Sequence, residues 1–385
     1  MNNFTYRNPV KIVFGKGTIA KLADLVPAKA RVLVLYGGGS IKRNGVYRQV
    51  RRALKGFAVE EFGGIEPNPL HETCMKAVAL ARRQRSTFLL AVGGGSVLDA
   101  TKYIAAAIPF GRGDPWAMLA KGAPVRDALP MGAVLTLPAT GSEMNRIAVV
   151  SRASTREKKG FGHEKLYPVF SILDPETTYS LPPRQTGNGI VDAFVHTTEQ
   201  YLTYPADAPL QDRQAEAILA TLVEEGPKAL RNPRDYAARA NLMWCATQAL
   251  NGAIGLGVPQ DWASHMIGHE LTALYGLDHA QTLAILLPGV WEHGFRRKRA
   301  KLAQYGRRVW GIRARGDDAA AREAIAATER FFRRVGVKTR LRDYGIDAAE
   351  AAREVRRRLA AQGAVFGEHR HITPAVAAKI VRARA

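Results

Sequence analysis

Four residues in the second half of the chain have the types and spacing of a metal site. Asp192 and His196 stand four positions apart, and His265 and His279 follow further along the chain. On a helix, residues i and i+4 share one face about 5–6 Å apart, which is close enough to bind one ion. One carboxylate and three imidazoles form a mixed oxygen and nitrogen set that suits Zn²⁺ or Fe²⁺. We therefore predict that these four residues bind one divalent metal.

This ligand set would leave the bound ion electrophilic, because one carboxylate offsets only one of the two positive charges. A single Asp-x3-His pair is weak evidence, since polar pairs at this spacing are common on solvated helix faces. The wider pattern is stronger: four of the nine histidines, namely His196, His265, His269 and His279, stand in apolar or glycine-flanked helical contexts.

Three glycine-containing segments in the first half each follow an apolar run typical of a buried strand. They cover residues 37–40, 93–96 and 136–143, and the second leads on to Asp99 and Lys102. Glycines let the backbone approach a phosphate closely, and a following helix offers its free N–H groups. No segment fits the G-x-G-x-x-G fingerprint or ends like a P-loop. One such loop could be an ordinary tight turn, but three together predict a nucleotide cradle.

The first of these loops indicates which coenzyme is bound. Enzymes that use NAD usually place an acidic side chain on the adenosine ribose, where it would repel a 2′-phosphate. The loop after Tyr36 runs through residues 37–43, contains Lys42 and Arg43, and has no carboxylate. A phosphorylated ribose would fit these charges, which predicts NADP(H). The alternative is that these residues form a basic surface turn.

The elements that position these residues differ between the two halves of the chain. Up to about Pro183, short apolar runs alternate with helical patterns, which predicts an α/β domain with a parallel sheet. The expected strands are residues 10–14 (an edge strand), 31–36, 87–92, 132–137 and 169–174, and the expected helices include 70–83 and 97–107. Beyond Pro183 the strand signals stop, and apolar residues recur at helical spacing. Helices are expected at residues 185–202, 211–223, 235–250, 260–275, 317–335 and 348–361.

We therefore predict two domains, an α/β dinucleotide-binding domain over residues 1–183 and an all-α metal-binding domain over residues 184–385. A chain of 385 residues is longer than a single core usually becomes, which favours the same division. No run of 18 apolar residues and no N-terminal leader pattern is present, so neither a membrane span nor a signal peptide is expected. Cys74 and Cys245 are too few for a disulfide framework and predict buried thiols in the cytoplasm.

The net charge of +22 is the unusual feature of the composition. Basic residues outnumber acidic ones 26 to 13 before Pro183 and 30 to 21 after it, so the excess is spread along the chain. Runs at residues 296–299 and 356–358 look like solvated helix faces. The aromatic residues that single-strand binders place among their basic ones are absent, so no specific nucleic-acid partner is expected. A nucleic-acid-binding protein with a vestigial site stays as an alternative from a different class.

Taken together, these segments resemble the group III, iron-containing alcohol dehydrogenases, and among them the NADPH-dependent, butanol-dehydrogenase-like branch of aldehyde reductases. The resemblance covers nearly the whole chain. It rests on residues 13–17, Glu66-Pro67-Asn68-Pro69, residues 93–102 and 136–143, Leu173-Asp174-Pro175, and the Asp192, His196, His265 and His279 set. The resemblance implies a dehydroquinate-synthase-like fold, with coenzyme and metal in the cleft between an α/β domain and a helical domain, and a homodimer.

The resemblance also implies a role for each matching residue. The first loop would face the 2′-phosphate, Asn68 the adenosine half, the second loop the pyrophosphate and nicotinamide ribose, and Thr140, Ser142, Asn145 and Lys158 the nicotinamide end. The expected coenzyme set is Gly37, Gly38, Gly39, Ser40, Lys42, Asn68, Gly94, Gly95, Ser96, Asp99, Thr136, Thr140, Ser142, Asn145 and Lys158. Asp192, His196, His265 and His279 would be the metal ligands. His269, beside the nicotinamide, and Asp99 would be the catalytic residues.

The implied activity is reversible hydride transfer between NADPH and small, broad-range aldehydes, with the metal polarising the carbonyl oxygen. The family name indicates iron, whereas members of this branch commonly hold zinc, and the ligand set permits both. A glycerol-dehydrogenase-like polyol dehydrogenase, or a lyase of the dehydroquinate synthase type, is the alternative with the same fold. Three residues depart from the branch, Met144, Arg146 and Ile147, and Arg146 could narrow the substrate pocket or favour acidic substrates.

Overall fold

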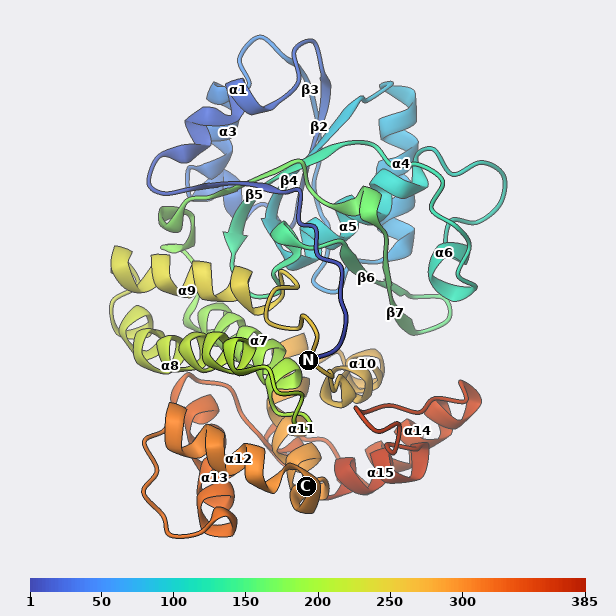
Figure 1. The fold of residues 1–385 in the computed structure, drawn as a ribbon. Helices are drawn as coiled ribbons and strands as arrows, with labels where there is room; N and C mark the ends of the chain where they lie inside the picture. The colour runs from blue at the N-terminus through green and yellow to red at the C-terminus, as the bar shows by residue number, and fades with distance from the viewer. The chain divides into compact units, whose positions relative to one another are not determined.

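The computed structural model describes all 385 residues, which form two compact units. One unit consists of Arg7–Leu181 and Pro233–Thr247, and the other of Met1–Tyr6, Pro182–Asn232 and Gln248–Ala385. The chain thus enters each unit more than once. The predicted division of the chain into residues 1–183 and 184–385 therefore describes the units only approximately. The first unit holds the strands and the second is helical (Figure 1).

The first unit contains a six-stranded sheet in which every pairing is parallel, in the order β1-β8-β5-β4-β2-β3. Its strands are β1 (Lys11–Phe14), β2 (Arg31–Tyr36), β3 (Ala58–Phe62), β4 (Phe88–Gly94), β5 (Met131–Leu137) and β8 (Phe170–Leu173). The five predicted strands are confirmed to within two residues at each end, and β1 lies at the edge as predicted. The sequence did not indicate β3, because this edge strand carries the exposed Glu60 and Glu61.

Both faces of the sheet are covered, which explains the near-continuous apolar runs. Leu33 and Leu35 of β2 pack in the core with α4 and α5, whereas Val32 and Val34 point to the opposite core with α1 and α3. The helices of this unit are α1 (Leu22–Leu25), α2 (Ser40–Arg43), α3 (Val46–Ala53), α4 (His71–Arg83), α5 (Gly95–Ala107) and α6 (Ala117–Ala120). A separate antiparallel hairpin, β6 (Ile147–Arg152) with β7 (Glu157–Gly162), follows β5.

The three glycine loops follow three strands that are neighbours in the sheet, β2, β4 and β5. Because the strands are parallel, their carboxyl ends meet at one edge, which is where ligands bind in open α/β sheets. The pairing of β4 with β5 shifts register between Gly93 and Gly94, so the second loop begins with an irregularity in the strand itself. The sheet therefore brings the three loops to one edge.

The second unit is built from long helices. They are α7 (Pro183–Tyr201), α8 (Pro209–Arg231), α10 (Ala263–Tyr275), α11 (His279–His293), α12 (Phe295–Val309), α13 (Asp317–Arg334), α14 (Ala348–Ala361) and α15 (Pro374–Arg382). Helix α9 (Tyr236–Ala249) belongs to the first unit up to Thr247. The six predicted helices are confirmed, and α8 continues eight residues beyond its predicted end. None of the helices combines the length and apolar character needed to cross a bilayer.

The basic run at residues 296–299 lies on α12, and its interpretation as a solvated face is wrong for one member. Arg296, Arg297 and Arg299 are exposed, but Lys298 is only 4% exposed. The Lys298 Nζ lies 3.0 Å from Asp261 Oδ2 and 2.7 Å from Glu368 Oε1, and both carboxylates are buried. Because successive residues of a helix point in different directions, Lys298 faces the core of the unit while its neighbours face solvent.

Candidate active site

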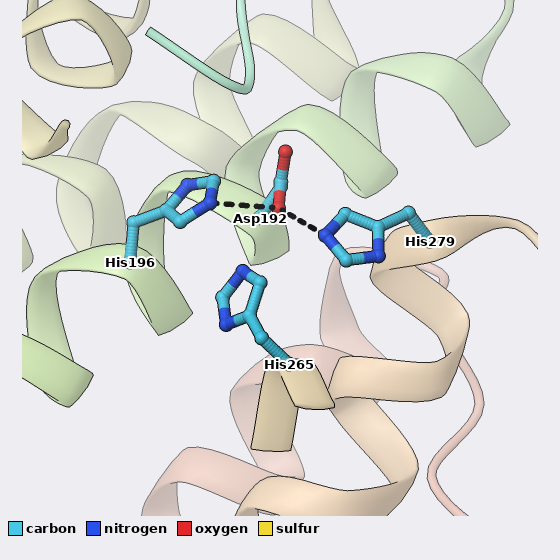
Figure 2. A group of neighbouring side chains, drawn as sticks. All are labelled: Asp192, His196, His265 and His279. Atoms are coloured by element: carbon cyan, nitrogen blue, oxygen red, sulfur yellow. Dashed lines mark ion pairs between the residues drawn. The ribbon is translucent and has the colours of Figure 1, made fainter. Parts of the chain in front are cut away.

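The four predicted metal ligands come together in the helical unit from three helices. Asp192 and His196 lie one turn apart on α7, His265 projects from α10, and His279 is the first residue of α11 (Figure 2). Helix α7 is buried along nearly its whole length, so its polar residues face protein rather than water. Polar groups at such positions need a partner inside the protein.

The ligand atoms of these residues all lie within 4.8 Å of one another. Asp192 Oδ1 is 3.7 Å from His196 Nε2 and 3.8 Å from His279 Nε2, distances too long for hydrogen bonds. This oxygen is buried and accepts no hydrogen bond. An ion bound at about 2.0–2.1 Å by four tetrahedral donors needs them about 3.3–3.5 Å apart. The donor set therefore fits a single divalent metal after a small contraction.

Glu199, which the sequence did not single out, holds one ligand in orientation. Its carboxylate is 3% exposed on the side chain and accepts hydrogen bonds from His265 Nδ1 and from the Ser264 N–H, the latter at 2.7 Å. With Nδ1 engaged in this way, Nε2 is the nitrogen of His265 that is left to face the cluster. Burial raises the pKa of Glu199 well above its usual range. The sequence feature that could have indicated Glu199 is its position on α7, three residues after His196.

His279 is the most exposed of the four ligands, with 24% of its side chain accessible against 5% for Asp192 and His196 and 10% for His265. It occupies the first turn of α11, where Asp278 and Gln281 form a capping box. Asp278 also accepts hydrogen bonds from Arg184 and, at 2.7 Å, from Asn188 Nδ2. The helix start is thus fixed to α7, and the cluster is most open on its His279 side.

His269 lies near the cluster but outside the set of four close donors. It follows His265 by one turn of α10, and its ring centroid is 5.7 Å from that of His279. This placement agrees with the prediction that His269 is not a metal ligand, whereas its predicted position beside the nicotinamide stays a prediction. Its catalytic role stays a prediction.

The first glycine loop has open space where a coenzyme would lie. Gly39 has a φ of 84°, in the left-handed region, and a Cβ at Gly38 or Gly39 would meet no atom within 4 Å. Lys42 offers a 2′-phosphate less positive charge than the sequence predicted, however. Its Nζ lies 3.1 Å from Glu61 Oε2 on β3, so a carboxylate already offsets its charge. A hydrogen bond to Tyr36 and then the Glu61 carboxylate raise the pKa of Lys42. Arg43 is exposed beside it.

The second loop leads into a helix end with the properties of a phosphate site. Helix α5 starts at Gly95 after an extended Gly94, has no side-chain cap, and has no acidic residue in its first turn. Its N–H groups and dipole therefore point a positive end at this edge of the sheet. A Cβ on Gly95 would lie 2.4 Å from the Thr140 side chain, so only glycine lets the second and third loops approach this closely.

Two residues that the resemblance placed at opposite ends of the coenzyme are in direct contact. Lys158 Nζ donates a hydrogen bond to Asn68 Oδ1 at 2.8 Å, and the Asn68 N–H donates to Ser96 Oγ at 3.3 Å. An extended dinucleotide cannot bring its adenosine and nicotinamide ends to one such pair. The contact with Ser96 favours the middle of the coenzyme for both side chains, and their placements at the two ends stay unsupported.

Both carboxylate oxygens of Asp99 accept hydrogen bonds from other residues of the chain. Its Oδ1 accepts a hydrogen bond from Ser142 Oγ at 2.7 Å and its Oδ2 one from the Val149 N–H at 2.9 Å. Burial raises the pKa of Asp99. These contacts tie α5 to the third loop and to β6. Thr136 and Asn145, which the resemblance also placed at the coenzyme, are both buried at this end of the sheet.

The departures from the branch pattern lie mostly at the surface. Arg146 forms an ion pair with Glu164 while its side chain is about half exposed, and Ile147, the first residue of β6, is 44% exposed. Met144 is partly buried, and its carbonyl accepts a hydrogen bond from Asn8. Arg146 is thus partly neutralised by a neighbour, which weakens the expectation that it selects acidic substrates.

Comparison with known families decides what this arrangement belongs to. The model described as iron-containing alcohol dehydrogenase matches residues 9–175, and the model described as Fe-containing alcohol dehydrogenase family, C-terminal, matches residues 186–383. The chain belongs to the iron-containing alcohol dehydrogenase family. It is therefore an oxidoreductase, and the resemblance and the fold class predicted from the sequence are confirmed.

Individual relatives agree with this assignment. The chain is 57% identical to the NADPH-dependent aldehyde reductase YqhD of Escherichia coli strain K12, over all of both chains. It is 43% identical to a probable NADH-dependent butanol dehydrogenase of Bacillus subtilis strain 168, over 90% of this chain and 91% of the relative. A crystal structure of Escherichia coli YqhD matches with a TM-score of 0.98 and 56% identity, covering 100% of this chain and 99% of that one.

Proposed function

We propose that this enzyme reduces small, broad-range aldehydes with NADPH at a single divalent metal, Zn²⁺ or Fe²⁺. The observation that carries the proposal is the convergence of Asp192, His196, His265 and His279, whose ligand atoms lie within 4.8 Å of one another around a buried carboxylate oxygen without a hydrogen bond. The relatives described above are named for aldehydes and butanol, which favours this activity over the polyol dehydrogenase alternative.

When bound, the metal would supply a Lewis acid for the carbonyl oxygen, and the coenzyme would supply the hydride. The protein's own residues do the positioning. Glu199 orients His265, and the capping box at Asp278 and Gln281 fixes His279 at the more exposed side of the cluster. We propose His269 as the group that passes a proton to the product, and its position beside His279, outside the four close donors, supports this role.

Elemental analysis of the purified protein, beside an aldehyde panel assayed with NADPH and NADH, tests the proposal. We expect close to one Zn or Fe per chain and aldehyde-dependent oxidation of NADPH. A protein that contains stoichiometric metal but oxidises neither coenzyme with any aldehyde would refute the proposed activity. Turnover of glycerol with NAD that exceeds aldehyde reduction would instead support the polyol alternative.

The preference for NADPH is the finer part of the proposal, since the relatives include enzymes named for each coenzyme. Support comes from the first loop, where Ser40, Arg43 and the open space at Gly39 would receive a 2′-phosphate. A charge-assisted hydrogen bond contributes about 1.5–3 kcal/mol. At about 1.4 kcal/mol per decade, NADPH should be favoured over NADH by roughly one to two orders of magnitude in kcat/KM.

Gly39→Asp should remove most of this preference, because its carboxylate would repel the 2′-phosphate. The φ of 84° at Gly39 strains any side chain, so the matched control is Gly39→Asn, which has the same shape without the charge. We expect the aspartate variant to lose NADPH preference, mainly through KM, and the asparagine variant to keep it. Equal loss in both variants would mean that strain, not charge, is responsible, and a wild type indifferent to the coenzyme would refute the placement.

We further propose a homodimer that pairs through the free edge of β1. This strand ends the sheet, and apolar side chains are exposed beside it: Phe14 at 41%, Val169 at 46% and Trp244 at 41%, with the Phe14 and Trp244 rings 6.1 Å apart. An edge strand with exposed apolar neighbours is a ready partner for its own copy. The cytoplasm is the proposed location, in keeping with Cys74 and Cys245, which are buried and form no disulfide.

Light scattering at micromolar concentration tests the assembly. The wild type should be a dimer, and Phe14→Glu should shift it towards monomer by placing a charge at the interface. Leu210→Glu is the control, since Leu210 is 62% exposed in the helical unit and should leave the mass unchanged. A monomeric wild type would rule out the proposed dimer.

A further inference from the structure

Lys102, the last residue of the glycine-loop motif, is a buried cation with all its hydrogen bonds made. It lies on α5 with none of its surface exposed. Its Nζ donates to Ser142 Oγ at 2.8 Å, to Asn145 Oδ1 at 3.0 Å and to the Ile147 carbonyl at 2.8 Å. An ammonium group has three N–H donors. Burying a charge is costly unless it is paired and hydrogen-bonded. We therefore expect the buried ammonium to hold the groups that accept its hydrogen bonds in fixed positions.

The three contacts determine how two predicted coenzyme residues present their polar groups. Lysine cannot accept a hydrogen bond, so the Asn145 atom that faces it is the amide oxygen, which also accepts from the Ile147 N–H at 3.0 Å. Ser142 Oγ accepts from Lys102 and therefore donates its own proton to Asp99 Oδ1 at 2.7 Å. The ammonium thus sets the direction of both side chains.

The charges around Lys102 make this arrangement sensitive to its protonation. Two carboxylates act on it, Asp99 from its own helix and Glu143 from the third loop, and Lys158 acts on Asp99 from β7. Burial lowers the pKa of Lys102 to about 8, against the opposing pull of these carboxylates. A neutral amine has only two N–H donors, so one of the three contacts would be lost when the proton leaves.

We propose that Lys102 is a positioning residue of the coenzyme site, whose ammonium orders Ser142 and Asn145 for the coenzyme, and that coenzyme binding weakens when this proton is lost. The inference rests on the proposed function, because that function makes this edge of the sheet the coenzyme site. The sign follows from linkage: the bound state prefers the protonated amine, so affinity is full below about pH 8 and falls above it.

The test is the Kd of NADPH for the metal-loaded enzyme, followed by fluorescence from pH 6.5 to 9.5. We expect a constant Kd at low pH and a rise of up to about tenfold per pH unit above the pKa of one proton. Calorimetry above that pKa, in two buffers of different ionisation enthalpy, should show uptake of close to one proton on binding. If Lys102 had only a structural role, the Kd would not depend on pH in this range and no proton would be taken up on binding.

Variants assign the proton to this residue. Lys102→Met should bind NADPH more weakly than wild type at pH 7 and lose the pH dependence, whereas Lys121→Met, at an exposed lysine after α6, should behave like wild type. Circular dichroism checks that each variant is folded, and if Lys102→Met does not fold, the wild-type Kd profile and proton uptake decide.

Different failures have different meanings. A wild-type Kd that stays constant to pH 9.5 overturns the inference, and so does a folded Lys102→Met protein that keeps the wild-type pH dependence. A wild type that binds no NADPH at pH 7 would instead refute the proposed function, and this inference with it.

Discussion

Replacing His265 with alanine is expected to remove the bound metal and to lower kcat/KM for aldehyde reduction by about 10³-fold or more. A metal that stabilises developing charge on oxygen contributes several kcal/mol, and each 1.36 kcal/mol corresponds to a factor of ten. The substitution also leaves Glu199 buried without the imidazole that it orients. His279→Ala should have a similar effect on activity. Metal content by elemental analysis and kcat/KM for one aldehyde are the measurements.

His269→Ala is the matched control, because His269 lies one turn from His265 on the same helix. It should retain the metal and lower kcat alone, by the roughly 10²–10⁴-fold that a general acid typically contributes. Undiminished activity in a metal-free His279→Ala protein would exclude the metal as a catalytic group. Loss of metal from His269→Ala would show that the ligand set has been assigned wrongly.

The second large effect is on stability. Lys298→Met should lower the free energy of unfolding by about 3–5 kcal/mol, because it leaves two carboxylates buried without their cation. Lys298 Nζ contacts Asp261 and Glu368 and donates to the Leu202 carbonyl at 2.6 Å. Although burial lowers it, the two carboxylates raise the pKa of Lys298, so the group is charged throughout the neutral range. Urea denaturation of the metal-free protein measures the change.

Arg299→Met provides the comparison within the same helix. Arg299 is exposed and pairs with Asp318 at 3.0 Å, and such surface pairs contribute about 0–1 kcal/mol. If the two variants unfolded at the same urea concentration, the buried cluster around Lys298 would not be a stabilising element.

Much of the fold could be predicted from the sequence, because burial leaves a pattern in it. Strand β2 matches the prediction at both ends, since a strand covered on both faces is an unbroken apolar run. Helix α11 was missed for a related reason. It is buried on nearly every side and contains Pro288, so its sequence shows neither the alternation of a surface helix nor an uninterrupted helical pattern.

The site was predicted where residue type alone indicates chemistry, and missed where the surroundings decide. A carboxylate and a histidine one helical turn apart, with two further histidines along the chain, indicate a metal site by their residue types, and the structure brings the four side chains together. Lysine and glutamate gave no such signal: whether Lys102, Lys298 or Glu199 is buried depends on distant segments. For the same reason the sequence missed Glu61, which comes from the neighbouring strand β3 to pair with Lys42.

The way in which the chain passes between its two units limits how the protein can be recombined. Met1–Tyr6 belongs with the helical unit, where the Asn2 N–H donates to the Gly257 carbonyl at 2.8 Å, and Pro233–Thr247 belongs with the α/β unit. A chimera made by joining the first 183 residues of one relative to the rest of another would therefore mix ancestries inside both cores. Thr247, whose hydroxyl donates to the buried Glu143, would then meet a foreign partner. Successful exchange between relatives must transfer the separated segments of each unit together.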